Sequence, residues 1–117
     1  MAKFRFQELR IWQVAMEIAN ELFDMANELE RKKLYRSADQ IRGSGMSMSN
    51  NISEGSGSSS KKEFRRYLDI ARRSTFENAN IVILLQMRKL ISTNALNSLL
   101  DRLDSLCLQV TSFQNSL

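Results

Sequence analysis

The chain has 117 residues, a net charge of +4 and no proline. This length suits one domain, spanning residues 1–117, with one core. There is no histidine and only one cysteine, Cys107. A Ser-His or Cys-His nucleophile and an internal disulfide framework are therefore excluded, and a zinc site would depend on carboxylates almost alone. We expect a protein that is not an enzyme, with no catalytic residues, no metal and no cofactor.

No apolar run approaches the roughly 20 residues needed to cross a bilayer. The first six residues, MAKFRF, lack the apolar core and small-residue cleavage site of a signal peptide. A single cysteine fits a reducing compartment. These features predict a cytoplasmic protein without a membrane partner.

Apolar residues repeat with helical spacing over residues 7–30. When the residues are numbered by sevens, four of the seven columns are apolar, whereas about three suffice for a helix on the surface of a monomer. We therefore expect this helix to pack against its own bundle and also against a second subunit. The column assigned to the subunit contact consists of Ile11, Ile18 and Met25. The polar side carries an acidic stripe, which is either solvated or a partner for basic residues: Glu17, Glu21, Asp24 and Glu28.

A second helix is predicted over residues 38–54, with Ser37 as its N-cap and Gly55 as its C-cap. Its apolar and small residues step by three and four, which is typical of one helix face: Ala38, Ile41, Gly45, Met48 and Ile52. Glycine inside a helix costs about 1 kcal/mol relative to alanine. Close packing should offset this cost at Gly43 and Gly45, and we expect Ser44 and Gly45 to lie close to Ala71, Ser74 and Thr75 of the third helix.

The third helix is predicted over residues 61–91, opening on a capping box from Ser60 to Glu63. Its segment 81–85 is apolar on every side, which indicates burial on every side. A second subunit would contact Phe76, Ile83 and Leu90, which are spaced by sevens. A fourth helix is predicted over residues 95–115. Four helices with short links predict an all-α, antiparallel up-down-up-down four-helix bundle that forms a homo-oligomer.

The positive charge is concentrated in the middle of the chain. Residues 31–89 carry thirteen Lys or Arg and five Asp or Glu, an excess of eight positive charges. Arginines and lysines cluster on the third helix, flanked by Arg42 on the second. The candidate nucleic-acid-binding residues are Arg42, Lys61, Lys62, Arg65, Arg66, Arg72 and Arg73. Their counter-ions are either nucleic-acid phosphates or the acidic stripe, on the same or a neighbouring subunit.

Four motifs resemble a known family. They are Phe6-Gln-Glu-Leu-Arg-Ile-Trp-Gln13, Gln40-Ile-Arg42, Asn51-Ile-Ser-Glu-Gly55 and Phe64-Arg-Arg-Tyr-Leu-Asp-Ile-Ala-Arg-Arg-Ser74. They are similar to the bacterial four-helix-bundle proteins encoded in 23S rRNA intervening sequences, a family that includes the accessory variability proteins of diversity-generating retroelements. The resemblance implies a cytoplasmic, non-enzymatic protein that assembles into a ring, typically a pentamer. Implied partners are RNA or DNA and, for retroelement members, a reverse transcriptase.

The chain departs from that pattern at three places. It has Gly43-Ser-Gly45 where the family usually has Arg-Ala-Ala, Ser49 where it has Pro, and Arg73 where it has Gly. Two functional hypotheses follow. The first is an oligomeric bundle that binds RNA or DNA backbone through the third helix. The second is a structural adaptor whose homo-oligomer docks a protein, with the basic cluster paired to the acidic stripe across subunits.

Overall fold

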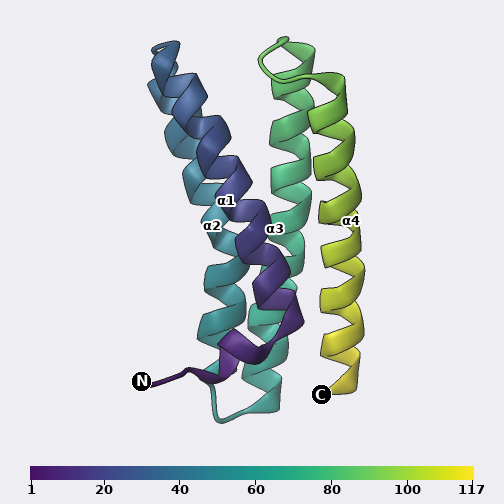
Figure 1. Cartoon of the computed structure of the whole chain (residues 1–117). Helices are drawn as coiled ribbons and strands as arrows, with labels where there is room; N and C mark the ends of the chain where they lie inside the picture. The colour runs from purple at the N-terminus through teal and green to yellow at the C-terminus, as the bar shows by residue number, and fades with distance from the viewer.

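The computed structural model describes all residues from 1 to 117, which form an all-helical protein without strands. A 3-10 turn precedes four α-helices: η1 (Arg5–Glu8), α1 (Arg10–Arg31), α2 (Tyr35–Ser56), α3 (Lys61–Met87) and α4 (Thr93–Ser116). They pack into a bundle of 44 × 29 × 21 Å (Figure 1). The α1–α2 and α3–α4 links lie at one end, and the two termini and the α2–α3 link lie at the other (Figure 1). The predicted all-α four-helix bundle is confirmed at this level.

Each helix turns an apolar face to a shared core. The largest fully buried side chains come from all four helices: Ile18, Leu22, Leu29, Ile41, Met48, Ile52, Leu68, Val82, Leu99, Leu103, Leu106 and Val110. Burying one such side chain stabilises the fold by about 1.5–3 kcal/mol relative to leaving it exposed. Helices that are consecutive in the chain make the richer contacts, and α1 meets α4 along the sparsest seam. In Figure 1 the α1–α2 pair diverges from α3 and α4 at the end of the bundle that holds the α1–α2 and α3–α4 links.

The helix ends differ from the predicted ones by a few residues. Segment 5–8 is a 3-10 turn, and extended Leu9 separates it from α1. Helix α2 begins at Tyr35, so the predicted N-cap at Ser37 is wrong. The α1–α2 link is shorter than predicted because Lys33 and Leu34 already bond back to the end of α1. Ser60 does cap α3, accepting a hydrogen bond from the Glu63 amide at 3.2 Å.

The small residues of α2 serve close packing at Gly45, as predicted, and also at Gly55, which was predicted to be a C-cap. A Cβ atom at Gly45 would lie 3.2 Å from Leu22 Cδ1, so Gly45 packs against α1 rather than against the predicted third helix, whereas its neighbour Ser44 does contact α3 through Asn78. At Gly55 a Cβ would lie 2.6 Å from Tyr67 Cβ, so only the absence of a side chain lets the start of α3 approach α2 this closely. Gly55 is therefore a packing residue inside α2, and the helix continues to Ser56. Gly43 has no neighbour within 4 Å, so no packing offsets its helical cost.

A buried polar network joins the middle of α2 to α3. The Asn78 side chain, 1% exposed, donates to the backbone carbonyls of Ser44 and Ser74, both at 2.8 Å. Its Oδ1 accepts from the Ser44 hydroxyl at 3.0 Å, and Ser47 and Ser74 hydroxyls meet at 2.8 Å. Every buried side-chain polar atom has a partner. Because an unpaired polar group in the core is costly, the network fixes the register of α2 against α3.

Candidate nucleic-acid interface

Six cations lie on the side of α3 that faces away from the core. They form the α3 basic face: Lys61, Lys62, Arg65, Arg66, Arg72 and Arg73. All are exposed except Arg72, which is half-buried. They share one side because the opposite side of α3, with Phe64, Leu68 and Ala71 spaced by four and three, is buried in the core. The structure thus brings together six of the seven predicted nucleic-acid-binding residues.

Two carboxylates on the same helix neutralise part of this charge. Arg66 pairs with Glu63 at 2.6 Å, and Asp69 accepts from Arg72 at 2.8 Å and lies 3.4 Å from Arg73. The hydrogen bond from Arg66 lowers the pKa of Glu63, and that from Arg72 lowers the pKa of Asp69. Six cations against two carboxylates leave an excess of four positive charges on this face.

The remaining members differ in how freely they can meet a ligand. Lys61 and Lys62 are exposed, form no ion pair and lie in the first turn of α3, where the helix dipole disfavours cations. Arg65 donates to the backbone oxygen of Leu117, and its own carbonyl accepts from Gln114 at 2.8 Å. The C-terminal turn of α4 is thereby held against the start of α3.

Arg42 does not join the α3 basic face. It lies on α2 with its side chain turned to α1, where it pairs with Glu30 and donates to Asn27 Oδ1 at 2.7 Å. The hydrogen bond to Glu30 raises the pKa of Arg42. This guanidinium ties α2 to α1 within the chain, so its role as a nucleic-acid ligand stays a prediction that the α3 basic face does not share.

Two carboxylates of the acidic stripe on α1 form ion pairs within the chain, and the other two are exposed to solvent. Glu21 pairs with Arg102 of α4, and Glu28 pairs with Arg31 of its own helix. Glu17 and Asp24 are exposed and form no ion pair. None of the four meets the α3 basic face within the chain.

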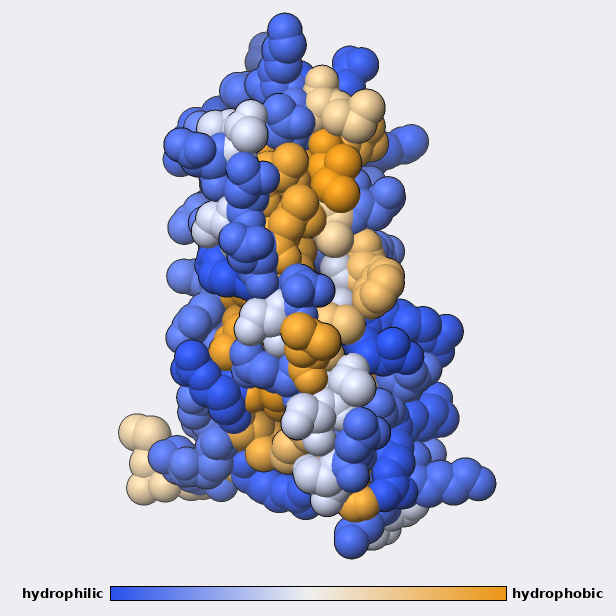
Figure 2. All heavy atoms as spheres, turned by 90° about the vertical axis from the view of Figure 1, so that its right-hand side faces the viewer, coloured by the Kyte–Doolittle hydropathy of each residue, from blue (hydrophilic) through white to orange (hydrophobic).

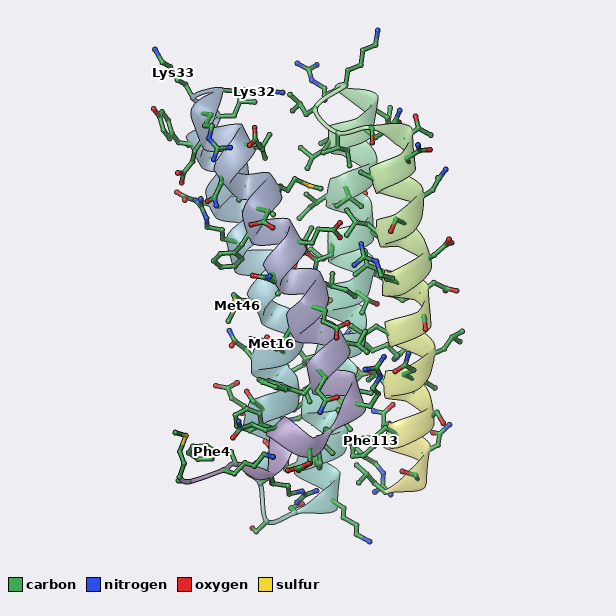
Figure 3. All side chains as sticks on the ribbon, in the orientation of Figure 1. Phe4, Met16, Lys32, Lys33, Met46 and Phe113 are labelled. Carbon is green, nitrogen blue, oxygen red and sulfur yellow. The ribbon has the colours of Figure 1, made fainter.

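The predicted subunit contacts fall into two groups. Ile11 and Ile18 are 4% and 0% exposed within the single chain, so their assignment to a subunit contact is wrong. Met25 is half-buried against the same core. The wide apolar surface of α1 is used internally, because α1 packs along α2 and also meets α4. What remains outside is a shallow hollow with Met16 and Phe23 of α1 and Met46 of α2, and Figure 3 shows Met16 beside Met46.

Phe76 and Ile83 lie in an open groove between α3 and α4. This apolar groove has a volume of about 460 Å³, and its apolar lining is Phe76, Ala79, Ile83, Leu100, Leu103 and Cys107. Phe76 is 66% exposed and Ile83 41%. Leu84 and Met87 are exposed further along α3, so the predicted burial of segment 81–85 on every side does not occur within the chain. Figure 2 shows the apolar strip exposed between hydrophilic side chains.

Leu90 lies away from the groove, in a hollow of about 430 Å³ at the end that holds the α1–α2 and α3–α4 links. Five cations surround this end of the bundle and form no ion pair: Lys32, Lys33, Arg36, Arg88 and Lys89. The sequence prediction did not include them. The signal that could have found them is a repeat, because Leu29–Leu34 and Leu85–Leu90 both read Leu-x-x-(Lys/Arg)-Lys-Leu.

The fold and its surfaces define a class: a small, basic, all-helical bundle with one exposed apolar groove and two cationic surfaces. None of the four α-helices combines the length and the apolar character that crossing a lipid bilayer requires. The sequence matches the family described as 23S rRNA-intervening sequence protein over residues 7–112, so the chain belongs to that family. A search of curated proteins found no match.

Proposed function

We propose that this chain is a cytoplasmic, non-enzymatic protein that binds RNA or DNA backbone as a homo-oligomer. In this proposal its helices form an antiparallel up-down-up-down bundle, and the bundles assemble into a ring, with a pentamer the state suggested by the family resemblance. The observation that carries the binding proposal is the α3 basic face, with six cations and only two carboxylates on one side of one helix.

Bound phosphates would neutralise the repulsion between the cations of this face. Unpaired cations repel one another on a helix, and Lys61 and Lys62 also oppose the dipole of α3. These terms destabilise the free protein and are relieved when phosphates approach. Nucleic-acid binding of this kind needs no sequence motif, because the contacts are to the backbone.

Assembly is supported by the apolar groove between α3 and α4. Phe76 and Ile83 expose apolar surface that a single chain leaves in water, and large exposed apolar patches are typical of interaction sites. A second copy covering the groove would bury both side chains. The α3 basic face ends about one turn before Phe76, so neighbouring copies would place their basic faces near one another.

The binding proposal is tested by titrating the oligomer with a fluorescent oligouridylate at several salt concentrations. About four neutralised phosphates on a single strand predict a slope of log affinity against log salt of roughly −3. Arg66→Ala with Arg73→Ala removes two exposed cations, so the slope should weaken by about 1.4 and the affinity at 0.1 M salt should fall roughly 25-fold.

The matched control is Lys3→Ala with Arg10→Ala, which removes the same charge from the N-terminal region. Its slope should stay close to that of the unmodified protein. Binding that is absent at every salt concentration, or that does not depend on salt, would disprove the proposal.

A second function, a structural adaptor that docks a protein, is favoured by one observation. The exposed apolar strip of α3 continues past the groove through Leu84 and Met87, further than one contact requires. If the oligomer forms but leaves these two side chains in water, the strip is free for a partner such as a reverse transcriptase. Fluorescence of a probe attached at Met87→Cys would then change on adding that partner and not on adding nucleic acid.

A further inference from the structure

The α1–α2 and α3–α4 links share a sequence and a three-dimensional structure. Residues 29–34 read LERKKL and residues 85–90 read LQMRKL. In the first link, Leu34 N–H donates to Leu29 O at 2.9 Å and Lys33 N–H to Glu30 O at 2.8 Å. In the second, the corresponding bonds from Leu90 and Lys89 are both 2.9 Å. Both links are therefore Schellman motifs, in which the chain turns back on the last carbonyls of a helix.

Each motif places lysine where glycine is usual. Lys33 has φ 64° and Lys89 has φ 60°, and they are the two non-glycine residues with positive φ. A side chain is disfavoured there because Cβ approaches the following carbonyl oxygen. A cation near a helix C-terminus recovers part of this cost, but Lys32 and Arg88 already supply one from positions with negative φ. The positive charge of the two lysines is thus retained against a local conformational penalty, which points to a role outside folding.

The two links form one surface, the cationic end: Lys32, Lys33, Arg36, Arg88 and Lys89. Figure 1 places both links at the same end, and Figure 3 shows Lys32 and Lys33 there, with Lys33 pointing away from the bundle. The carboxylates in the first link and its flanks already pair with other arginines: Glu28 with Arg31, and Glu30 and Asp39 with Arg42. Residues 78–100 contain no acidic residue. In contrast to the α3 basic face, none of these five cations has a partner in the chain.

Between the links lies the hollow of about 430 Å³. Leu34 and Ser37 line it from one side and Leu84, Leu85, Arg88 and Leu90 from the other, so its floor is apolar and its edge carries a guanidinium. Tyr35, the residue after the first motif, is 60% exposed. Cations around an apolar hollow with an exposed aromatic ring are the features that single-stranded nucleic acid meets on its binding proteins, where phosphates pair with cations and unstacked bases lie on apolar or aromatic surfaces.

We propose that the cationic end binds single-stranded nucleic acid, with the backbone crossing both links, an unpaired base in the hollow and another stacked on Tyr35. The inference rests on the proposed nucleic-acid binding and assigns that binding to a second surface, distinct from the α3 basic face. A duplex would not suit this surface, because its bases are not free to enter the hollow.

The test uses the full chain, a fluorescent oligouridylate and the variant Lys33→Gly with Lys89→Gly. Glycine relieves the positive φ, so this variant should melt at the same or a higher temperature than the unmodified protein. The loss of two phosphate contacts should weaken the salt slope by about 1.4 and lower the affinity at 0.1 M salt roughly 25-fold. Tyr35→Ala should lower the affinity roughly tenfold with an unchanged slope, and Tyr35→Phe should restore it.

The charge-matched control, Lys3→Ala with Arg10→Ala, should leave affinity and slope unchanged. If the glycine variant binds as tightly as the unmodified protein while Arg66→Ala with Arg73→Ala does not, this inference is overturned and the proposed function stands. If the control lowers the affinity for oligouridylate as much as the glycine variant does, the affinity depends on net charge alone and the inference is also overturned. If the unmodified protein binds phosphatidylserine vesicles but no oligouridylate, both proposals fail.

Discussion

Two glycines of α2 show how different the demands on one residue type can be. Gly43 lies on an exposed part of the helix with open space around it, whereas Gly55 lies where α3 crosses at close range. Both have right-handed helical backbone, since no glycine has positive φ. The difference between them is therefore packing alone.

This difference predicts opposite effects of the same substitution. Gly43→Ala should stabilise the protein by about 0.4–1 kcal/mol, because alanine reduces the freedom of the unfolded chain and meets nothing in the folded one. Gly55→Ala should destabilise it by about 1–3 kcal/mol, because the new methyl would overlap Tyr67 and Phe64. Urea unfolding of the two variants measures both values. Equal effects in the two variants would contradict the close packing of α2 against α3.

The ion pairs and the burial of individual side chains could be predicted from the sequence only in part. The spacing of Glu63 and Asp69, each three residues before an arginine, is a sequence signal for the pairs that form. The ion pair between Arg42 and Glu30 was not predictable, because it depends on how α2 is rotated about its axis against α1. Burial of Ile11 and Ile18 likewise followed from the packing of α1 against α2 and α4, which an apolar column does not reveal.

At the scale of the element, α3 combines a charged first half with an apolar second half on its outer side. Asp69 controls how much charge the first half presents, because it is shared by Arg72 and Arg73. It is the only carboxylate between Glu63 and Glu77. The helix thus contains a single position at which one neutral substitution frees two guanidinium groups.

Asp69→Asn should therefore tighten binding of the oligouridylate. One additional phosphate contact predicts a salt slope steeper by about 0.7 and an affinity up to about fivefold higher at 0.1 M salt. Fluorescence anisotropy over a range of salt concentrations measures both. Asp101→Asn makes the same charge change on the exposed side of α4 and should have little effect. A weaker affinity for the Asp69 variant would show that the pair positions Arg72 and Arg73 for binding.

The same carboxylate contributes to stability in a defined pH range. Its hydrogen bond from Arg72 lowers its pKa in the folded state, so the contribution is present above the unfolded pKa of about 3.9 and is lost as pH falls through the lower folded value. The effect is small, because the side chain is 38% exposed and solvent screens the pair. The Asp69→Asn protein should lose less stability than the unmodified one over this acidic range.

The number of helices and their faces followed from periodicity, whereas their ends did not. Helix ends depend on which of several possible capping arrangements is the most stable. The Schellman motif at Lys33 ends α1 and turns the chain back at once, so α2 starts at Tyr35. Ser37 had the right chemistry for an N-cap but lies inside the helix. Gly55 had the right chemistry for a C-cap but was needed for packing against Tyr67. A residue type that serves two purposes leaves its sequence signal ambiguous.

At the scale of the whole molecule, the exposed apolar groove predicts assembly. Phe76→Asp places a charge in the groove without removing a core side chain, because Phe76 is largely exposed in the single chain. The variant should therefore fold normally and lose its oligomeric state, giving a mass close to the 13.5 kDa of one chain by light scattering.

Leu108→Asp provides the control for this prediction. Leu108 is as exposed as Phe76 but lies outside the groove, so its substitution should leave the oligomer intact. Dissociation by both variants would mean that a different face of α4 makes the contact. An unchanged mass for Phe76→Asp would show that the groove is not covered by a second copy.

The sparse seam between α1 and α4 has a consequence for how the chain acquires its structure. The other contacts between α-helices join helices that are adjacent in the chain, so most of the native contacts close short loops, which favours rapid folding. Only the α1–α4 seam, with its Glu21–Arg102 pair, requires the first and last helices to meet. A three-helix intermediate that lacks a docked α4 would already contain the Asn78 network and the Gly55 contact. Folding can thus proceed from the centre of the chain, with closure of that seam as its last step.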